Sequence, residues 1–395
     1  MTLQVPSASA SHAPAATAGP AATPRPWLRL ASYPDRNPGN PYIELFYRAL
    51  THHGIEHAGR LVPEASWLSG AGQGTDAVHI HWPERIWRGK RRGRAEEILA
   101  WVSGRSIRGV WRLRQFLERA RQRGIVRVWT VHNVAHHEGS TAVDRWGYRV
   151  LARHSDLLLC FSHAAEAELR REYGNSTPIV VISIGTYKGV YPPPRPRAEA
   201  CARLGLNPEV PIVSCLGLLR PYKGVEVACE AAEALGGRVQ LFVAGAPNRA
   251  FDSKGLVARA AASGGAIVAV PRTLTEDEFA DAVGASEAVV LPYRAITGSS
   301  MLFAAWTLGA GVIASDLPFF REMLDGRPLL GRTFRNGDAA DLARAIETYL
   351  AIPLEERRQA IAAAVDDLEP ERVVTPFVEA LRTWRDRAAA SAPSR

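Results

Sequence analysis

Residues 211–226, which read PIVSCLGLLRPYKGVE, contain a complete connection from a strand to a helix. The β-rich run ends at Gly217, which allows a sharp turn, and a helical pattern begins near Val225. Arg220 and Lys223 lie in the loop between them. The free amides of a helix N-terminus and two neighbouring cations suit a doubly charged diphosphate. The alternative for this stretch alone is a solvated basic turn.

Further β-rich runs follow this stretch, and each leads through a loop into a helical pattern. They are VQLFVAG (239–245), AIVAV (266–270), EAVVLPY (287–293) and GVIAS (311–315). Thr275 and Glu278 form a capping box that opens one of the helices. Such alternation is typical of α/β layers around a mostly parallel sheet.

The first half of the chain repeats the same pattern. Its strands are predicted at WLRLAS (27–32), DAVHIH (76–81), IVRVWTV (125–131), DLLLCF (156–161) and PIVVIS (178–183), and its helices at 42–53, 108–123, 145–154 and 164–173. The predicted fold class is therefore α/β, with two doubly wound, Rossmann-like domains. Ligands of such domains bind beyond the carboxyl ends of the strands, so we expect a cleft between the two sheets.

Composition shifts indicate the domain boundaries. We expect a disordered Ala/Ser/Pro-rich tail at 1–26, an N-terminal domain at 27–190, a linker at 191–198, a C-terminal domain at 199–368 and a final helix within 369–395. The linker contains YPPPRPR, because consecutive prolines favour a stiff, extended connection. The final helix carries one apolar face and so needs a partner surface.

The composition of the 395-residue chain is that of a globular protein, with 47% hydrophobic and 22% charged residues. No apolar run approaches the roughly 20 residues of a membrane-spanning helix. The four cysteines are scattered without a C-x-x-C pair, which suits reduced thiols in the cytoplasm.

The positive charge of the chain is concentrated in one segment. Residues 85–127 hold fourteen Lys or Arg and three Glu, an excess larger than the net charge of +8 of the whole chain. Tryptophans and aliphatic residues are interleaved with these cations, which suits an anionic membrane surface. The alternatives are a solvated face over core aromatics, or a nucleic-acid footprint on a non-enzymatic protein.

A second loop in the C-terminal half has phosphate-binding character. YRAITGSSML (293–302) follows a strand and combines Thr297, Gly298, Ser299 and Ser300 at a predicted helix start. Its unpaired backbone N–H groups can cradle phosphate oxygens. A simple helix cap is the alternative for this loop alone.

Three loops of the first half carry groups suited to proton transfer or to binding hydroxyls. The predicted catalytic candidates are Glu138, Glu84 and His132, and the predicted hydroxyl-binding residues are Asn40, His81 and Asn133. For any one of them a structural role is the alternative. The histidines lack a matching carboxylate pattern, so we expect no metal site. No G-x-G-x-x-G follows the first strand of either half and no P-loop is present, which argues against dehydrogenases and P-loop NTPases.

The chain resembles a GT-B fold glycosyltransferase that uses a nucleotide-sugar donor. More narrowly, it resembles the GDP-mannose:glycolipid 4-β-D-mannosyltransferases of xanthan-type exopolysaccharide assembly. The similarity rests on NPYIELFYRAL, VHIHWPE, TVHNVAHHE, GLLRPYKGVE and VVLPYRAITGSSML, and it spans most of residues 40–314. RPYKG and HIHWPE are its most specific parts.

The resemblance implies that the C-terminal domain binds the donor and the N-terminal domain binds the acceptor. The implied donor-binding residues are Gly217, Arg220, Lys223, Arg272, Tyr293, Thr297, Gly298, Ser299 and Ser300, with Arg272 and Tyr293 near the base and ribose. The final helix is expected to cross back onto the N-terminal domain. No cofactor or metal is expected, since the nucleotide sugar is a co-substrate, and a lipid-linked or saccharide acceptor and an anionic membrane surface are the expected partners.

One departure bears on the mechanism. Many retaining GT-B enzymes carry two glutamates eight residues apart around the helix after the donor loop, whereas here that helix reads SSMLFAAWTLGAG, without an acid. An inverting displacement with a single base is therefore favoured. The expected activity is transfer of a sugar, mannose by resemblance, with inversion. Alternatives are a retaining GT-B enzyme with another nucleotide sugar, or a nucleotide-sugar epimerase of this fold. The expected location is the inner face of the cell membrane, bound peripherally.

Overall fold

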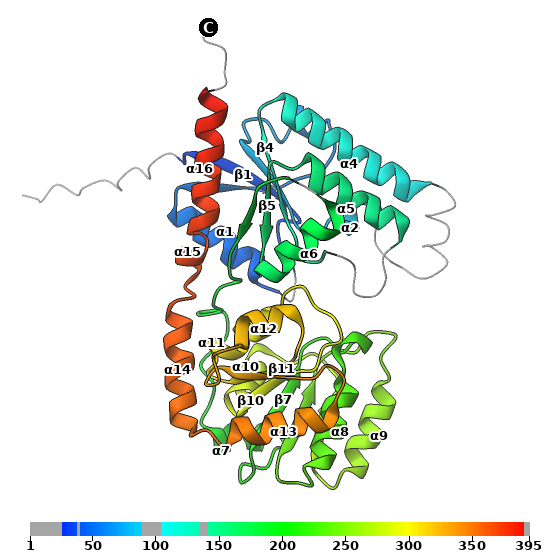
Figure 1. Ribbon diagram of the computed structural model, residues 1–395, viewed down its shortest axis with the longest axis vertical. Coiled ribbons are helices and arrows are strands. Elements are labelled where there is room, and N and C mark those ends of the chain that lie inside the picture. The colour runs from blue at the N-terminus through cyan, green and yellow to red at the C-terminus, as the bar shows by residue number, and fades with distance from the viewer. Residues whose placement is uncertain (1–25, 38–39, 89–103, 135–140, 175, 391–395) are drawn as a thin grey trace, which may run out of the picture.

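The chain folds into two halves, each built around its own six-stranded sheet (Figure 1). This arrangement is seen in a computed structural model that describes residues 26–37, 40–88, 104–134, 141–174 and 176–390. Every strand pair within the two sheets is parallel. The predicted α/β class with two Rossmann-like halves is therefore confirmed.

The N-terminal half has strand order β2-β1-β3-β4-β5-β6. Its strands are β1 (Leu28–Tyr33), β2 (Ile55–Arg60), β3 (Ala77–Ile80), β4 (Val126–Thr130), β5 (Leu157–Cys160) and β6 (Ile179–Val181). Its described helices are α1 (Tyr42–His52), the 3-10 turn η1 (Trp67–Ser69), α2 (Glu84–Arg88), α4 (Arg105–Gln122), α5 (Ala142–His154) and α6 (His163–Tyr173). The order changes direction between β1 and β3, so the loops after these strands border a crevice.

The C-terminal half has strand order β12-β11-β10-β7-β8-β9. Its strands are β7 (Ile212–Leu216), β8 (Gln240–Ala244), β9 (Ile267–Val270), β10 (Ala288–Leu291), β11 (Gly311–Ser315) and β12 (Gly331–Phe334). Its helices are α7 (Arg197–Leu204), the 3-10 turn η2 (Pro221–Lys223), α8 (Val225–Ala234), α9 (Ser253–Ala262), α10 (Glu276–Gly284), α11 (Ser300–Thr307), α12 (Pro318–Leu324) and α13 (Ala339–Leu350). Here the change of direction lies between β7 and β10, so the two loops predicted to bind phosphate flank one crevice.

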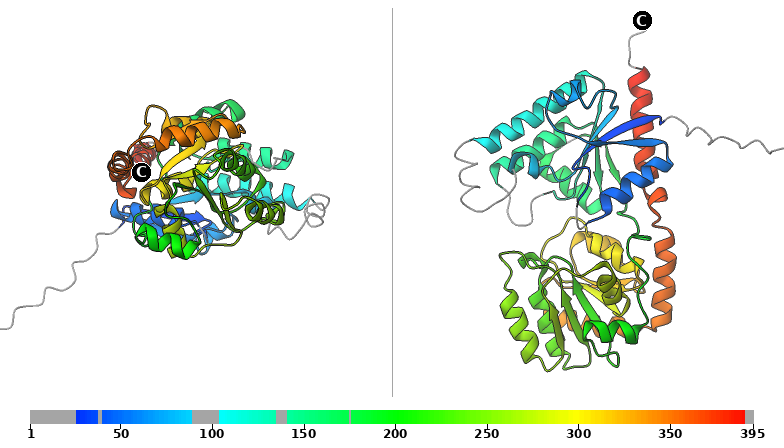
Figure 2. Two further views of the ribbon diagram at one scale, coloured as in Figure 1. Left: turned by 90° about the horizontal axis from the view of Figure 1, so that it is seen from below. Right: turned by 180° about the vertical axis from the view of Figure 1, so that it is seen from behind.

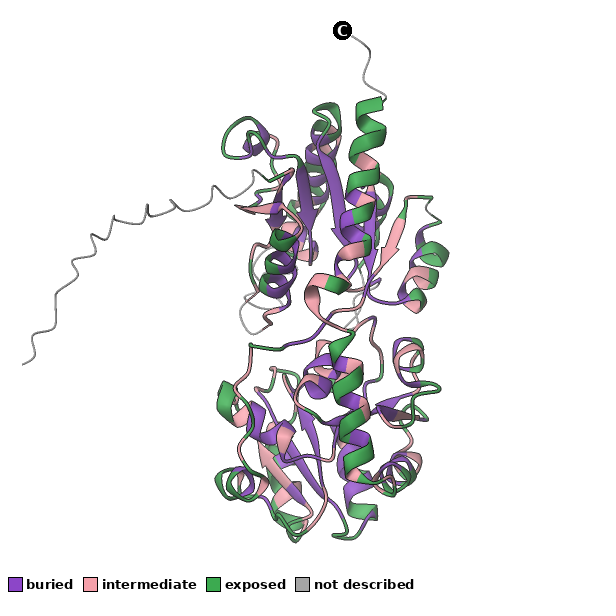
Figure 3. Cartoon of the chain, turned by 90° about the vertical axis from the view of Figure 1, so that its left-hand side faces the viewer, coloured by how far each residue is buried: buried purple, intermediate pink, exposed green. Residues whose placement is uncertain are grey.

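Two edge strands, β2 and β12, were absent from the sequence prediction. The central strands β3, β4, β7, β8, β10 and β11 are buried at every position, as expected for parallel strands covered on both faces (Figure 3). By contrast, only Ile55 is buried in β2 and only the two end residues are buried in β12, and both strands contain charged side chains. They therefore lack the mostly apolar, fully buried run that marks the central strands.

The end of the chain crosses back from the C-terminal to the N-terminal half. Helix α14 (Leu354–Asp366) runs beside the C-terminal half, and α15 (Pro370–Val373) and α16 (Thr375–Ala390) lie on the N-terminal half (Figures 1 and 2). Phe377 of α16 packs against Phe46 and His79, with ring centroids 5.6 and 5.7 Å apart. The predicted apolar face of the final helix thus completes the core of the N-terminal half.

The described part of the basic segment has a buried and an exposed side. Val110, Leu113, Phe116 and Leu117 of α4 belong to the core, whereas Ile107 and Trp111, one helical turn apart, are 51% and 53% exposed. Trp101 lies outside the described residues. Among the described helices, none combines the length and the apolar character that crossing a bilayer requires.

Candidate active site

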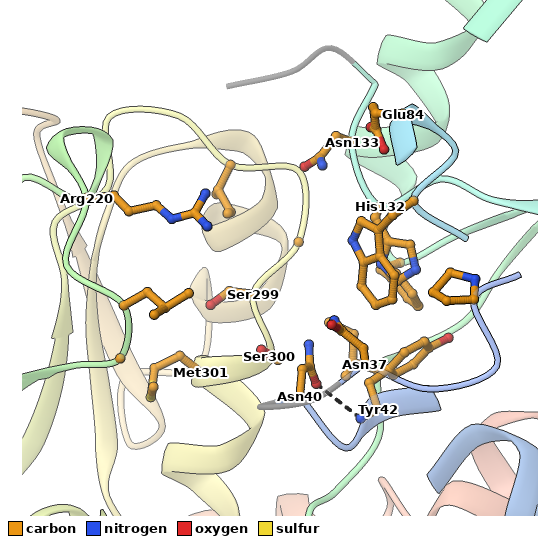
Figure 4. A pocket seen from close by; sticks show the side chains of 18 of the residues that line it. Asn37, Asn40, Tyr42, Glu84, His132, Asn133, Arg220, Ser299, Ser300 and Met301 are labelled. Atoms are coloured by element: carbon orange, nitrogen blue, oxygen red, sulfur yellow. Dashed lines mark hydrogen bonds between the residues drawn. The ribbon is translucent and has the colours of Figure 1, made fainter. Parts of the chain in front are cut away.

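A cleft of about 1120 Å³ separates the two halves and is lined by loops from both sheets. Of the residues predicted to bind or react, the lining includes Gly217, Arg220, Lys223, Tyr293, Gly298, Ser299 and Ser300 from the C-terminal half and Asn40, Glu84, His132 and Asn133 from the N-terminal half. Figure 4 shows the two groups on opposite walls, with Arg220, Ser299 and Ser300 facing Asn40, His132 and Glu84. Residues more than 80 positions apart in sequence are therefore brought to one space.

The C-terminal wall is formed where the loops after β7 and β10 pack together. The backbone N–H of Arg294 donates to the carbonyl of Tyr222 at 2.7 Å, which joins the two loops. Gly224 has a φ of +63°, and a Cβ at this position would lie 2.0 Å from the carbonyl oxygen of Pro292. Only glycine tolerates both conditions, so the RPYKG loop depends on Gly224 for its close approach to the second loop.

Lys223 is held in this wall without a carboxylate partner among the described residues. Its Nζ lies 5.1 Å from the ring centroid of Tyr293, a cation–π contact. Burial lowers the pKa of Lys223 to about 8, and the positive charge of Arg220 also lowers it. Arg220 and Lys223 are therefore neighbouring cations, and Lys223 is shielded from water. A bound anion would stabilise both positive charges.

The start of α11 adds amide donors to the same wall. Ser299 is the N-cap residue, and no side chain caps this helix terminus. Gly298, Ser299 and Ser300 all line the cleft. Thr297 is 6% exposed and does not line the cleft.

Arg272 lies apart from the cleft lining. Its guanidinium donates to the carboxylate of Glu278 at 2.7 and 2.8 Å, on the exposed side of α10. Glu278 is also the residue that closes the predicted capping box with Thr275, which is present. The charge of Arg272 is therefore compensated locally, and its predicted place near the base and ribose of a donor is not evident from its position.

Glu84 presents a carboxylate from the N-terminal wall at the start of α2. The hydroxyl of Tyr148 on α5 donates a short hydrogen bond to Glu84 Oε1. Burial raises the pKa of Glu84 above its ordinary value, and the hydrogen bond from Tyr148 opposes that shift. A carboxylate with a raised pKa at a cleft is suited to general-base chemistry.

His132 lines the same wall as Glu84 and contacts buried side chains. Its ring stacks on Trp82 with centroids 3.9 Å apart. His132 Nε2 lies 3.0 Å from His81 Nδ1, a hydrogen bond between two imidazoles. His81 is 0% exposed and does not line the cleft, so its predicted contact with an acceptor is not what its position offers. It supports His132 instead.

The remaining predicted residues have simpler surroundings. Asn40 Oδ1 accepts from the backbone N–H of Tyr42 at 3.1 Å, at the beginning of α1. Asn133 lines the cleft next to His132. Glu138 lies outside the described residues. Among the described residues, no group of three His, Cys, Asp or Glu side chains is arranged to hold a metal ion.

Sequence reasoning missed several residues of this site. Trp82, Asn248 and the cations Arg60 and Arg85 also line the cleft. Trp82 lies inside the HIHWPE motif, in which the pattern pointed only to the histidines and to Glu84. Asn248 follows β8, whose carboxyl end borders the same crevice. Its position after a predicted strand is the signal from which it could have been found.

The C-terminal half matches a known family of sugar-transferring enzymes. Residues 210–351 match the family described as glycosyl transferases group 1. A GDP-mannose:glycolipid 4-beta-D-mannosyltransferase of Xanthomonas campestris pv. campestris is 29% identical over 245 residues. That match covers 60% of this chain and 61% of the relative, so less than two thirds of the relative's length is matched.

Solved structures share the whole architecture. Sucrose-phosphate synthase from Thermosynechococcus elongatus aligns with a TM-score of 0.67 at 18% identity, over 92% of this chain and 100% of that one. HepE of Anabaena in complex with UDP and glucose aligns with a TM-score of 0.66 at 15% identity, over 90% of this chain and 99% of that one. The predicted resemblance and the GT-B fold are confirmed, and the matches together support the interpretation of the chain as a glycosyltransferase.

Proposed function

We propose that this protein transfers a sugar from a nucleotide-sugar donor to a hydroxyl group of an acceptor. The observation that carries the proposal is the opposition of two walls across one cleft. One wall holds Arg220, Lys223 and the uncapped start of α11, and the other holds Glu84 and His132. The first wall suits a diphosphate leaving group, and the second suits an acceptor hydroxyl that must lose a proton.

The donor diphosphate is assigned to the C-terminal wall on charge. Transfer of the sugar leaves a nucleoside diphosphate, and its developing negative charge is stabilised by fixed cations and amides. Lys223 and Arg220 together with the amides near Ser299 supply that field without a metal ion. The ring of Tyr293 contacts the Lys223 ammonium. A Cβ built on Gly217 would lie 3.2 Å from Lys223 Nζ, so Gly217 lies close to the same ammonium.

The proposed reaction inverts the anomeric centre. Helix α11 carries no carboxylate, and none of the described C-terminal residues that line the cleft is acidic. A single-step displacement needs one base on the acceptor side. Glu84 is the described residue best suited to that role, because its raised pKa brings it nearer to neutral pH than an ordinary carboxylate. Glu138 remains a proposed alternative base.

Mannose from GDP-mannose is proposed as the transferred group, with a lipid-linked or saccharide acceptor. This proposal rests on the relative from Xanthomonas campestris, whose name specifies both GDP-mannose and a glycolipid. A place in exopolysaccharide or glycolipid synthesis is part of the same proposal.

A lipid-linked acceptor would require contact with a membrane, and α4 offers a suitable surface. Ile107 and Trp111 project outward among the arginines of this helix. Apolar side chains flanked by cations favour the interface of an anionic bilayer. We therefore propose peripheral membrane binding through α4.

The experiment that tests the function is a titration of the full chain with a panel of nucleotide sugars. Binding of one donor, release of its nucleoside diphosphate with acceptor present, and an inverted linkage in the product by NMR are the expected results. Conversion of the donor sugar without acceptor would favour an epimerase, and a product of retained configuration would reject the inverting mechanism. Binding of RNA in preference to every nucleotide sugar would reject the enzyme.

A further inference from the structure

A continuous chain of hydrogen bonds runs from the core of the N-terminal half to the cleft. Thr130 Oγ1 lies 2.6 Å from His79 Nε2, and His79 Nδ1 lies 2.8 Å from the hydroxyl of Tyr47. The same hydroxyl lies 2.9 Å from His81 Nε2, and His81 Nδ1 lies 3.0 Å from His132 Nε2. Of these groups only His132 lines the cleft.

The three histidines of this chain are neutral. Burial lowers the pKa of His79 and His132 well below the ordinary value, and lowers the pKa of His81 to about 3. A neutral imidazole has one N–H donor and one bare nitrogen. Each hydrogen bond in the chain therefore has a single direction, and the direction of one bond determines that of the next.

The hydroxyl of Tyr47 is the branch point, because it has one hydrogen to donate. If it donates to His81 Nε2, then His81 Nδ1 carries a hydrogen, donates to His132, and leaves the hydrogen of His132 on Nδ1. If it donates elsewhere, His81 donates to Tyr47 and accepts from His132 Nε2–H. In that second arrangement His132 Nδ1 is a bare acceptor.

Two observations favour the second arrangement. The hydroxyl of Tyr47 also lies 2.8 Å from His79 Nδ1, so its hydrogen has another acceptor, and His79 can then donate from Nε2 to Thr130 Oγ1. The arrangement also places the hydrogens of both His81 and His132 on Nε2, which is the more stable neutral tautomer of histidine in water. The first arrangement forces both rings into the less stable form.

Nδ1 of His132 is open to the cleft. It makes no hydrogen bond to any described residue, and it is not fully buried. Its ring is fixed by stacking on Trp82 and by edge contact with Tyr42. The nitrogen therefore has a defined direction and a defined hydrogen-bonding character.

We propose that Tyr47 and His81 are positioning residues that hold His132 as the neutral Nε2–H tautomer, so that its Nδ1 accepts a hydrogen bond from a substrate hydroxyl. Such an acceptor selects a hydroxyl-bearing sugar over a deoxy analogue, which would leave Nδ1 unpaired. It also disfavours groups that can only accept, such as a carboxylate. The identity of the ligand as a sugar rests on the proposed function, whereas the tautomer does not.

The tautomer is tested by long-range proton–nitrogen correlation NMR on the full chain labelled at its histidine nitrogens. The His132 signals are assigned by their loss in His132→Gln. We expect a hydrogen on Nε2 and a bare Nδ1 at about neutral pH. Tyr47→Phe, which keeps the ring that stacks on His57 at 4.0 Å, should shift His132 toward a mixture of tautomers. A hydrogen on Nδ1 in the unmodified protein, or an unchanged His132 in Tyr47→Phe, would overturn the proposal.

A second pair of variants covers the case in which Tyr47→Phe does not fold. His81→Asn places an amide oxygen near the position of Nδ1 and should preserve the Nε2–H tautomer, whereas His81→Leu should not. If both variants give the same His132 signals, the proposal is wrong.

Activity provides a separate measurement. Tyr47→Phe should lower kcat by about tenfold or more while the Kd for the nucleotide sugar stays the same, because the cationic wall is untouched. A loss of donor affinity equal to the loss of kcat would indicate a general structural effect and reject the positioning role. If the unmodified protein shows the expected tautomer but binds no nucleotide sugar, the proposed function fails and the tautomer assignment stands.

Discussion

The carboxylate of Glu322 in the C-terminal half accepts a 2.8 Å hydrogen bond from the backbone N–H of His163 in the N-terminal half. Its other oxygen accepts from the next amide, that of Ala164, also at 2.8 Å. A residue of α12 therefore caps the start of α6, a helix of the opposite half. The hydroxyl of Ser162 caps the following amide, so Glu322 supplies part of a terminus that α6 does not complete alone.

Removing this contact should loosen the packing of the two halves against each other. Glu322→Ala leaves two amides of α6 without their acceptor, at a cost of about 1 kcal/mol. We expect a lower Tm and a larger radius of gyration in small-angle scattering. Glu230→Ala, which removes an exposed carboxylate from α8, is the matched control. Equal scattering of the two variants would show that Glu322 does not hold the halves together.

The two cations of the RPYKG loop should dominate donor affinity. Arg220→Ala or Lys223→Ala removes a charge-assisted contact of about 1.5–3 kcal/mol, which raises the Kd for the donor about tenfold to a hundredfold. Calorimetric titration with nucleoside diphosphate measures the effect. Lys254→Ala, which removes an exposed ammonium from α9 outside the cleft lining, should leave the Kd unchanged. Donor affinity that survives both cleft substitutions would exclude the proposed diphosphate site.

The buried ammonium of Lys223 should make donor binding sensitive to alkaline pH. Burial lowers its pKa to about 8, so the group is charged below this pH and neutral above it. Only the charged form attracts the diphosphate, so affinity should be level below about pH 8 and fall by up to tenfold per pH unit above it. Lys223→Arg keeps its charge and should remove the alkaline decline. The same decline in Lys223→Arg would assign the titration to another group.

Glu84 should govern turnover rather than donor binding. Glu84→Gln is expected to lower kcat by about 10²–10⁴-fold with an unchanged donor Kd, because a neutral amide cannot accept the proton. A variant that retains full activity would reject Glu84 as the base and leave Glu138 to be tested in the same way.

Tyr148 gives an independent test through the pH profile of kcat. Its hydrogen bond stabilises the ionised form of Glu84 and so lowers the pKa of that carboxyl. Tyr148→Phe should raise this pKa, and because the base must be ionised, the acidic limb of the profile should move to higher pH. An acidic limb at its original position would show that another group titrates there.

The exposed pair on α4 should control attachment to lipid. Ile107→Ser with Trp111→Ser should weaken binding to vesicles that contain anionic lipid by about tenfold or more. Vesicle sedimentation measures the effect, and Val257→Ser, which removes a 47% exposed valine from α9, is the control. An equal loss of vesicle binding in the α4 variant and in Val257→Ser would show that α4 is not the specific membrane-binding surface.

The central strands and the donor loops could be predicted because their signals are local. Strand β10 is a continuous apolar run, and β7 is interrupted only by Ser214. Arg220 and Lys223 lie within four residues of each other in the loop that follows β7. The edge strand β2 could not be predicted in this way, since it pairs on one side only and mixes charged with apolar residues.

The support behind the N-terminal wall was beyond sequence reasoning. Tyr47 and Tyr148 are aromatic positions on the buried faces of α1 and α5, where a pattern indicates core packing and no more. Their roles depend on His81 and Glu84, which are 34 and 64 residues away along the chain. Arg272 is the opposite case: it is a cation in a loop of the right half, but Glu278 six residues later compensates its charge, so its contact with a donor stays a prediction.

The return of α16 onto the N-terminal half has a consequence for the order of folding during synthesis. Phe377, Val378 and Leu381 fill the core beside β1 and α1, yet they emerge from the ribosome only after the strands and helices of the C-terminal half. The C-terminal half is contiguous in sequence and can mature as soon as it is translated. The N-terminal half, which is made first, therefore keeps an apolar face exposed until α16 has been translated and packs against it.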